Sequence, residues 1–177
     1  PIRADKRENG AYYSPSKDIV VLPMKAQFNI GASPEETYRG GMEYYSTMLH
    51  EMTHSTMTPE RLNREMGGRF GDPKYAKEEL VAELTAAMIS HSMGFDSRIT
   101  DNSAAYLDSW IGVLKQEPKF IVSVMADVNK ASDLILDHVD KQRLALGEQP
   151  YLAKNDPLTS MSADEEKSFK NAAIVKT

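Results

Sequence analysis

Two histidines separated by three residues are the feature of this sequence best suited to chemistry. They occur in the run His50-Glu51-Met52-Thr53-His54. On a helix, side chains four positions apart project from the same side, about one turn apart. Two imidazoles at that spacing can bind one zinc ion, while the glutamate between them can polarise a metal-bound water. The run therefore predicts a helical zinc site with His50 and His54 as ligands and Glu51 as the catalytic base.

The residues around this run indicate which way the two histidines face. From about residue 43 to residue 55, apolar residues recur with helical spacing and form one stripe. At about 100° per residue, both histidines lie nearly opposite this stripe, so we expect them to face a cleft or solvent. The alternative is a pair of surface histidines on an amphipathic helix, and a third ligand would decide between the two. The stripe consists of Tyr45, Met48, Leu49 and Met52.

Three glutamates further along the chain, Glu78, Glu79 and Glu83, are candidates for the third ligand. Glu79 and Glu83 are four residues apart, where like charges mildly destabilise a helix. A nearby dication, or a histidine whose free ring nitrogen needs a partner, would offset this repulsion. We therefore predict that Glu79 is the third metal ligand and that Glu83 orients a ligating imidazole, with Glu78 as the rival for the ligand role. The alternative is a solvated acidic face balanced by Lys74 and Lys77.

The elements that must position these residues begin with a predicted antiparallel hairpin. Runs of aromatic or β-branched residues at 11–13 and 19–22 are separated by a Ser-Pro-Ser-Lys turn, and Pro23 closes the second run. We also expect the second strand, Ile19 to Leu22, to pair with an extended substrate at its edge.

A predicted helix start follows the hairpin. Ser33 supplies an N-cap, Pro34 lies in the first turn and Glu36 completes a capping box. We expect a short helix that is interrupted at Gly40-Gly41, before the helix that carries the histidines.

The remaining sequence predicts three more helices. The first runs from about 75 to 93 and ends at Gly94, and the second runs from about 100 to 115. The third begins near Pro118 and ends near residue 146, before Gly147. The expected fold is a helix-rich α+β domain with a small antiparallel sheet near its start.

Composition limits the class of protein. The 177 residues are enough for one domain, which we place at residues 1–148, followed by a polar tail or linker at residues 149–177. The net charge is −5, which argues against a general nucleic-acid clamp. There is no cysteine, so disulfide scaffolds, thiolate zinc fingers and cysteine nucleophiles are excluded.

The hydropathy pattern predicts a protein without a membrane-spanning segment. The longest purely apolar runs, such as 19–22, are four or five residues, far below the length that a bilayer requires. No signal peptide is recognisable, so a cytoplasmic location is expected. The chain begins with Pro1 rather than methionine, which suggests a piece of a longer protein.

Taken together, the motifs resemble the zincin-type metallopeptidase domain of ArdC-like antirestriction proteins, which occur on conjugative plasmids and in phage polyvalent proteins. The resemblance covers roughly residues 10 to 140 and preserves the order of the motifs. The residues that carry it are Tyr44 to His54, Arg61 to Arg64, Phe70 to Asp72, Tyr75 to Glu83 and Ala104 to Trp110.

This resemblance implies a compact gluzincin-like fold. It also implies zinc held by His50, His54 and a glutamate of the run from 78 to 83, with Glu51 as general base. Family members join this domain to an amino-terminal module that binds single-stranded DNA. The present chain lacks that module, so nucleic-acid binding is not expected of this domain itself.

The expected activity is hydrolysis of peptide bonds in a protein or peptide substrate. Glu51 would take a proton from the zinc-bound water and return it to the departing amine. Tyr106, which belongs to the resembling run, is a candidate donor to the oxyanion, and core packing is the alternative role for it.

A second hypothesis belongs to a different class of protein. The zinc centre would be catalytically idle inside an interaction module that masks host restriction or defence proteins. A third option, a nuclease, finds no support in basic clusters or in a second set of metal ligands.

Overall fold

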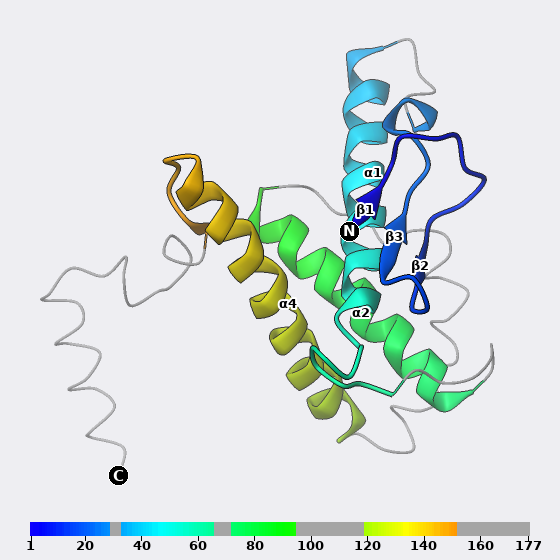
Figure 1. Ribbon diagram of the computed structural model, residues 1–177, viewed down its shortest axis with the longest axis vertical. Helices are drawn as coiled ribbons and strands as arrows, with labels where there is room; N and C mark the ends of the chain where they lie inside the picture. Colours follow the sequence, from blue (N-terminus) through cyan, green and yellow to red (C-terminus); the bar gives the residue numbers. More distant parts are fainter. Residues whose placement is uncertain (29–32, 66–71, 95–118, 152–177) are drawn as a thin grey trace, which may run out of the picture. The chain divides into compact units, whose positions relative to one another are not determined.

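The computed structural model describes residues 1–28, 33–65, 72–94 and 119–151 (Figure 1). These residues form a small sheet, one short 3-10 helix and three long helices. The sheet contains β1 (Ile2–Arg3), β2 (Tyr12–Ser14) and β3 (Ile19–Val21), and the 3-10 helix η1 is Lys25–Gln27. The long helices are α1 (Pro34–Ser55), α2 (Pro73–Ser92) and α4 (Phe120–Ala145).

The sheet contains the predicted hairpin and one strand that was not predicted. β2 pairs with β3 in antiparallel fashion, and β1 pairs with the other edge of β3 in parallel. The order β1-β3-β2 makes β3 the central strand, and its residues Val20 and Val21 are buried. The expectation that β3 pairs with a substrate at its edge is therefore wrong, because both of its edges are already occupied.

α1 is one continuous helix, so the predicted interruption at Gly40-Gly41 is wrong. Its start is as expected: Ser33 and Glu36 form a reciprocal capping box, and Pro34 occupies the first turn. The two glycines lie inside the helix and are buried. A glycine costs a helix about 1 kcal/mol relative to alanine, which a 22-residue helix with a strong cap and tertiary contacts can absorb.

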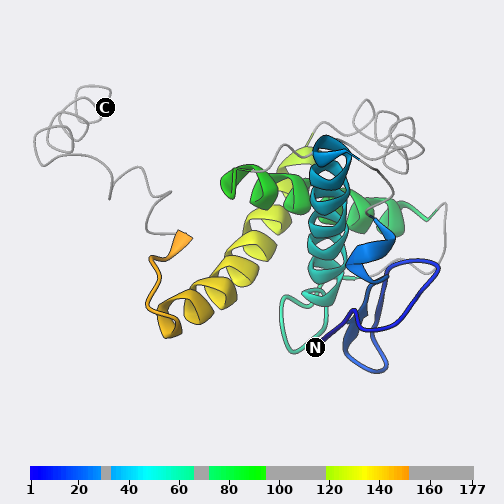
Figure 2. The same ribbon diagram turned by 90° about the horizontal axis from the view of Figure 1, so that it is seen from above.

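α2 confirms the predicted helix over residues 75–93, with a start two residues earlier. The Asp72 side chain accepts a hydrogen bond from the backbone N–H of Lys74, and Pro73 is the first helical residue. Beyond the helix end, Gly94 has φ of +78°, which favours glycine. Figures 1 and 2 both show α1 crossing α2, and α1 also contacts β2 and β3.

α4 confirms the predicted helix over residues 118–146, and its first part packs on α2. The shared core contains Leu80 and Val81 from α2 and Val124 and Val128 from α4. An ion pair of 2.7 Å between Lys77 and Asp127 joins the same two helices. This core holds in place the helix that carries the three candidate glutamates.

The chain divides into two compact units, residues 1–135 and 136–177. In the second unit, the Asp140 carboxylate accepts a hydrogen bond from the backbone N–H of Tyr151, and Arg143 lies over the ring of Tyr151. The predicted domain boundary at 148/149 stays a prediction. The helix expected at 100–115 and the tail beyond residue 151 lie outside the described residues.

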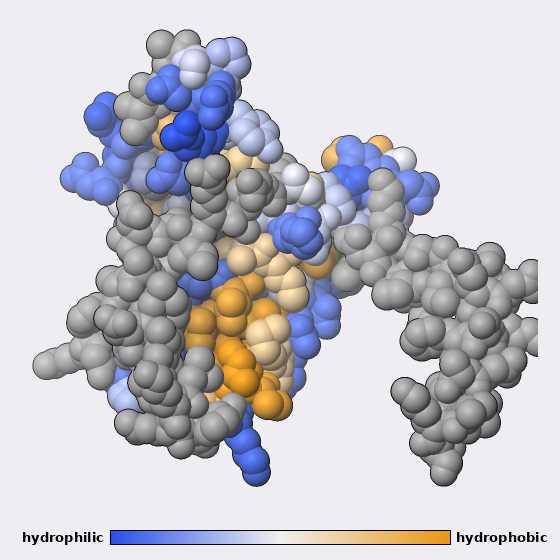
Figure 3. All heavy atoms as spheres, turned by 180° about the vertical axis from the view of Figure 1, so that it is seen from behind, coloured by the Kyte–Doolittle hydropathy of each residue, from blue (hydrophilic) through white to orange (hydrophobic). Residues whose placement is uncertain are grey.

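Apolar surface remains exposed in the described part of the chain. Figure 3 shows one area where hydrophobic side chains gather among mostly hydrophilic ones. Large exposed hydrophobic side chains include Ile121, Val122 and Met125, near the start of α4. None of the described helices has the combination of length and apolarity that crossing a bilayer requires.

Candidate metal centre

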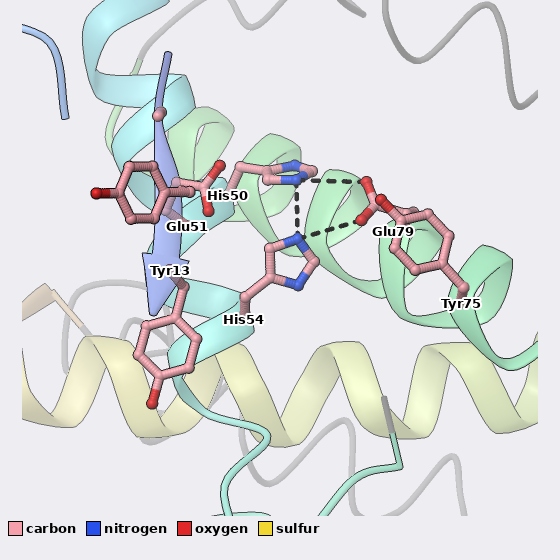
Figure 4. Close-up of a pocket in the computed structure, with 8 residues that line it drawn as sticks. Tyr13, His50, Glu51, His54, Tyr75 and Glu79 are labelled. Atoms are coloured by element: carbon pink, nitrogen blue, oxygen red, sulfur yellow. Dashed lines mark hydrogen bonds and ion pairs between the residues drawn. The ribbon is translucent and has the colours of Figure 1, made fainter. Parts of the chain in front are cut away.

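Two helices bring three metal-binding side chains together. α1 contributes His50 and His54, and α2 contributes Glu79 (Figure 4). The Nε2 atoms of the histidines are 3.0 Å apart. The Nε2 of His50 lies 3.6 Å from Oε2 of Glu79, and the Nε2 of His54 lies 3.5 Å from Oε1 of the same carboxylate. The structure therefore brings these three side chains together, as predicted.

The spacing of these atoms fits a divalent metal ion. In tetrahedral zinc sites, bonds of about 2.0–2.1 Å place the ligand atoms about 3.3–3.4 Å apart. The three distances here are 3.0, 3.5 and 3.6 Å, which bracket that value. Two imidazoles and one carboxylate also form a donor set typical of catalytic zinc sites, in which further positions stay open. The residues present therefore fit such an ion.

Each histidine has a second carboxylate behind its ring. Oε1 of Glu83 lies 3.4 Å from Nδ1 of His50, and Oε1 of Glu78 lies 3.3 Å from Nδ1 of His54. A carboxylate at Nδ1 favours the tautomer with a proton there and leaves the Nε2 lone pair for a metal. Burial disfavours the charged form of His50, but Glu83, Glu51 and Glu79 outweigh it and raise its pKa.

Glu78 faces Nδ1 of His54, whereas a shared metal ligand would have to face the Nε2 atoms of the two histidines. Its two oxygens lie against the guanidinium of Arg64 and Nδ1 of His54, and the Nε2 atoms face Glu79 instead. Burial raises the pKa of Glu78, but hydrogen bonds and charge from Arg64 and His54 reverse this and lower it. Of the two rivals, it is Glu79 that the structure brings to the metal-facing nitrogens.

Glu51 projects into a pocket beside the histidines. The cavity has a volume of about 250 Å³ and an aromatic border formed in part by Tyr12, Tyr13 and Tyr75 (Figure 4). Burial raises the pKa of Glu51, Glu79 adds to the increase, and His54 and His50 oppose it. The backbone of Tyr13 also lowers this pKa. Glu51 is therefore a partly desolvated carboxylate next to β2.

The pocket is lined by residues of β2, α1 and α2 and by Ala11, which precedes β2. The complete lining is Ala11, Tyr12, Tyr13, His50, Glu51, His54, Tyr75 and Glu79. Sequence reasoning missed the three tyrosines, because no spacing rule relates the hairpin or the start of α2 to the histidine run. Tyr106, the expected oxyanion donor, lies outside the described residues.

The hairpin that carries Tyr13 is anchored to the end of α1. The Arg61 guanidinium donates two hydrogen bonds of 2.8 Å to the two oxygens of Asp18, and it also donates to the carbonyl of Ser55. The Tyr13 hydroxyl donates to the same Asp18 carboxylate at 2.8 Å. These bonds lower the pKa of Asp18 to about 2, with Arg61 as the main cause. The network holds β2 beside the pocket.

Comparison with curated proteins finds long, clearly similar segments. The chain is 37% identical over 132 residues to the DNA primase TraC of Escherichia coli, and 33% identical over 131 residues to the uncharacterized protein y4eC of Sinorhizobium fredii. The alignments cover 75% and 73% of this chain but only 11% and 39% of these relatives. The chain thus corresponds to a part of each.

Solved structures show the same fold. The Mn(II)-bound crystal structure of the antirestriction protein ArdC from plasmid R388 superposes with a TM-score of 0.60 at 36% identity, covering 77% of this chain and 46% of that one. The metal-free ArdC structure gives 0.59 at 36% identity, covering 84% and 47%. The predicted resemblance to ArdC-like proteins is confirmed, and so is the helix-rich α+β fold.

Residues 2–127, more than half of the chain, match the family described as zincin-like metallopeptidase. This range contains both histidines of α1 and all the candidate glutamates of α2. Together with the geometry of the site, the match shows that the chain belongs to the zincin-like metallopeptidase family.

Proposed function

We propose that this chain is a zinc-dependent peptidase domain that hydrolyses peptide bonds in a protein or peptide substrate. One observation carries the proposal: the Nε2 atoms of His50 and His54 and the carboxylate of Glu79 converge at a pocket that also holds Glu51. Membership of a zincin-like metallopeptidase family supports it. The similar ArdC structure is Mn(II)-bound, which supports a divalent metal as the cofactor.

In this proposal, His50, His54 and Glu79 hold the ion, while Glu83 and Glu78 orient the two imidazoles from behind. Zinc bound there would act as a Lewis acid that lowers the pKa of its water and polarises the carbonyl of the substrate. The three side chains are only 8–18% exposed, so these charges lie in a site of lowered dielectric, where they act more strongly than in water.

Glu51 is the proposed general base. It accepts the proton of the attacking water and then gives that proton to the departing amine nitrogen. Burial raises the pKa of Glu51, which makes the first transfer easier, because the carboxylate is then a stronger base. Tyr106 remains the proposed donor to the oxyanion.

The wider role follows from the similarity to ArdC. We propose that the domain forms part of a larger antirestriction protein of a mobile element, and that its partners are host restriction or defence proteins in the cytoplasm. ArdC supports the antirestriction role, and the chain spans less than half of ArdC.

The experiment compares cleavage of a broad peptide library by the zinc-loaded chain and by two variants. Glu51→Gln should bind about one equivalent of zinc and cleave nothing. Glu43→Gln, an exposed glutamate on the same helix, should cleave as the unmodified chain does. Absence of cleavage by the zinc-loaded, unmodified chain would refute the peptidase and favour the catalytically idle interaction module.

A further inference from the structure

Arg64 makes an unusually large number of contacts for a side chain outside the metal-binding set. Its Nε and Nη2 donate to the two oxygens of Glu78 at 2.9 and 2.7 Å. Nη1 donates to the Thr56 hydroxyl at 2.8 Å, and Nη2 also donates to the carbonyl of Thr53 at 3.0 Å. The side chains of Arg64 and Glu78 are only 7% and 4% exposed. This is a buried ion pair in which all three guanidinium nitrogens and both carboxylate oxygens form hydrogen bonds.

The loop after α1 is shaped to return Arg64 to that helix. The backbone N–H groups of Leu62 and Arg64 donate to the carbonyls of Thr56 and Met57, each at 3.0 Å. Between them Asn63 has φ of +47°, a left-handed conformation that asparagine tolerates better than most residues. The turn reverses the chain within a few residues of the metal-binding histidines.

The ion pair fixes the direction of the Glu78 carboxylate. A buried carboxylate without a partner would rotate toward water. The planar guanidinium satisfies both oxygens at once, which a lysine ammonium cannot do with the same geometry. Oε1 of Glu78 then remains 3.3 Å from Nδ1 of His54 and can accept a hydrogen bond from Nδ1–H. The lone pair of Nε2 is thereby directed toward Glu79.

We propose that Arg64 is a positioning residue of the metal centre, which acts through Glu78 to fix the tautomer and ring direction of His54. The inference rests on the proposed function, since it assigns Arg64 to the same metal site. The hydrogen bonds of Arg64 go to Glu78, Thr56 and the Thr53 carbonyl and not to the side chains of the three ligands. Its effect is transmitted along one line of contacts, from the guanidinium to the carboxylate and from the carboxylate to the imidazole.

A purely structural role makes a different prediction. The bonds from Arg64 to the Thr53 carbonyl and the Thr56 hydroxyl also close the end of α1, so loss of Arg64 alone would destabilise the chain under either interpretation. Metal affinity separates the two interpretations, because a helix-end contact has no reason to depend on Glu78. A double-mutant cycle measures that dependence directly.

The experiment measures the zinc dissociation constant of the full chain by chelator competition, for Arg64→Lys, Glu78→Gln and the double variant. Each single substitution should weaken zinc binding by roughly 10- to 100-fold. The double variant should bind zinc as tightly as the single variant that binds it less tightly, because both substitutions break the same line of contacts. The absorption spectrum of the Co²⁺-loaded chain should change in Arg64→Lys, since the direction of a ligating imidazole changes.

Arg61→Lys is the matched control. Arg61 lies in the same loop and also forms two hydrogen bonds with one carboxylate, that of Asp18. The Arg61 side chain is 33% exposed, and among the described residues no hydrogen bond or ion pair joins Asp18 to either histidine. Its zinc affinity should equal that of the unmodified chain. Circular dichroism of the metal-free forms confirms that the variants are folded.

The outcomes distinguish this inference from the proposed function. If the unmodified chain binds zinc and Arg64→Lys binds it equally well, Arg64 is not a positioning residue, whereas the peptidase proposal stands. If the losses of zinc affinity in the two single variants multiply in the double variant, Arg64 does not act through Glu78. If the unmodified chain binds no zinc, the proposed function fails and this inference fails with it.

Discussion

The Nε2 atoms of His50 and His54 lie 3.0 Å apart, and each is nearest to a different oxygen of Glu79. Both Nδ1 atoms face outer carboxylates, which favours the tautomer with a lone pair on each Nε2. Two lone pairs at this distance repel each other unless a proton or a metal ion lies between them. The packing of α1 on α2 therefore creates a site whose stability depends on a cation.

Zinc should stabilise the folded chain. At a free zinc concentration of 100 times the dissociation constant, linkage adds about 2.7 kcal/mol, which raises the melting temperature of a chain of this size by roughly 5–10 °C. The zinc-induced rise in melting temperature should vanish in His50→Ala. It should persist in His91→Ala, because His91 is exposed and lies at the end of α2. Thermal unfolding with and without chelator measures it. An equal shift in His50→Ala would contradict the ligand assignment.

Replacement of Glu79 should weaken zinc binding more than replacement of Glu83, although both glutamates lie close to His50. Glu79→Gln removes a charged ligand, so zinc affinity should fall by more than about 100-fold. Glu83→Gln removes the negative charge behind His50 and should cost roughly 10- to 100-fold. Isothermal titration of both variants under one buffer condition gives the comparison. The reverse order would exchange their roles.

Tyr106→Phe tests the proposed oxyanion donor. Loss of one donor lowers kcat by roughly 10²- to 10³-fold, whereas zinc affinity and KM should stay near their original values. Tyr38→Phe is the control, because Tyr38 is an exposed tyrosine of α1. Steady-state kinetics on one cleaved peptide measures both variants. Unchanged turnover in Tyr106→Phe would leave the packing role as the explanation for this residue.

The histidine and glutamate positions were predictable because helix geometry is local. Four-residue spacing fixes the direction of His50 and His54 relative to each other, and the same spacing relates Glu79 to Glu83. The sequence could not show that the two helices face each other, which depends on the packing of α1 against α2. The repulsion between Glu79 and Glu83 suggested a shared cation or a histidine partner, and the resemblance to a known family then supported that long-range prediction.

The errors arose where the outcome depends on distant residues. β1 is only two residues long and carries no strong strand signal, yet its pairing makes β3 central. Arg64 was visible only as part of a resembling run, because its contact with Glu78 depends on the left-handed turn at Asn63. A buried carboxylate beside a histidine, such as Glu78, needs a positively charged partner. The sequence alone does not show which arginine is that partner.

Acid should weaken the attachment of the hairpin to α1. The pKa of Asp18 is lowered from 3.8 to about 2 by hydrogen bonds from Arg61 and Tyr13, so its ionised form favours the folded state. This contribution is complete above about pH 4 and is lost as the pH falls toward 2. The difference in melting temperature between the unmodified chain and Asp18→Asn should be constant above pH 4 and shrink below it. A difference that does not change between pH 4 and pH 2 would show that Asp18 has no lowered pKa.

Thr85 offers a test of the buried polar groups. Its hydroxyl is completely buried on α2 and has no hydrogen-bond partner in the described structure, which costs free energy that folding must offset. Thr85→Val keeps the shape and removes the unsatisfied group, so it should stabilise the chain by about 1 kcal/mol. Thr53, equally buried on α1, donates to the carbonyl of Leu49 at 2.8 Å, and Thr53→Val should instead destabilise it. Urea unfolding of both variants gives the two free energies. A destabilised Thr85→Val would indicate that this hydroxyl is hydrogen-bonded in solution, with α2 packed differently around it.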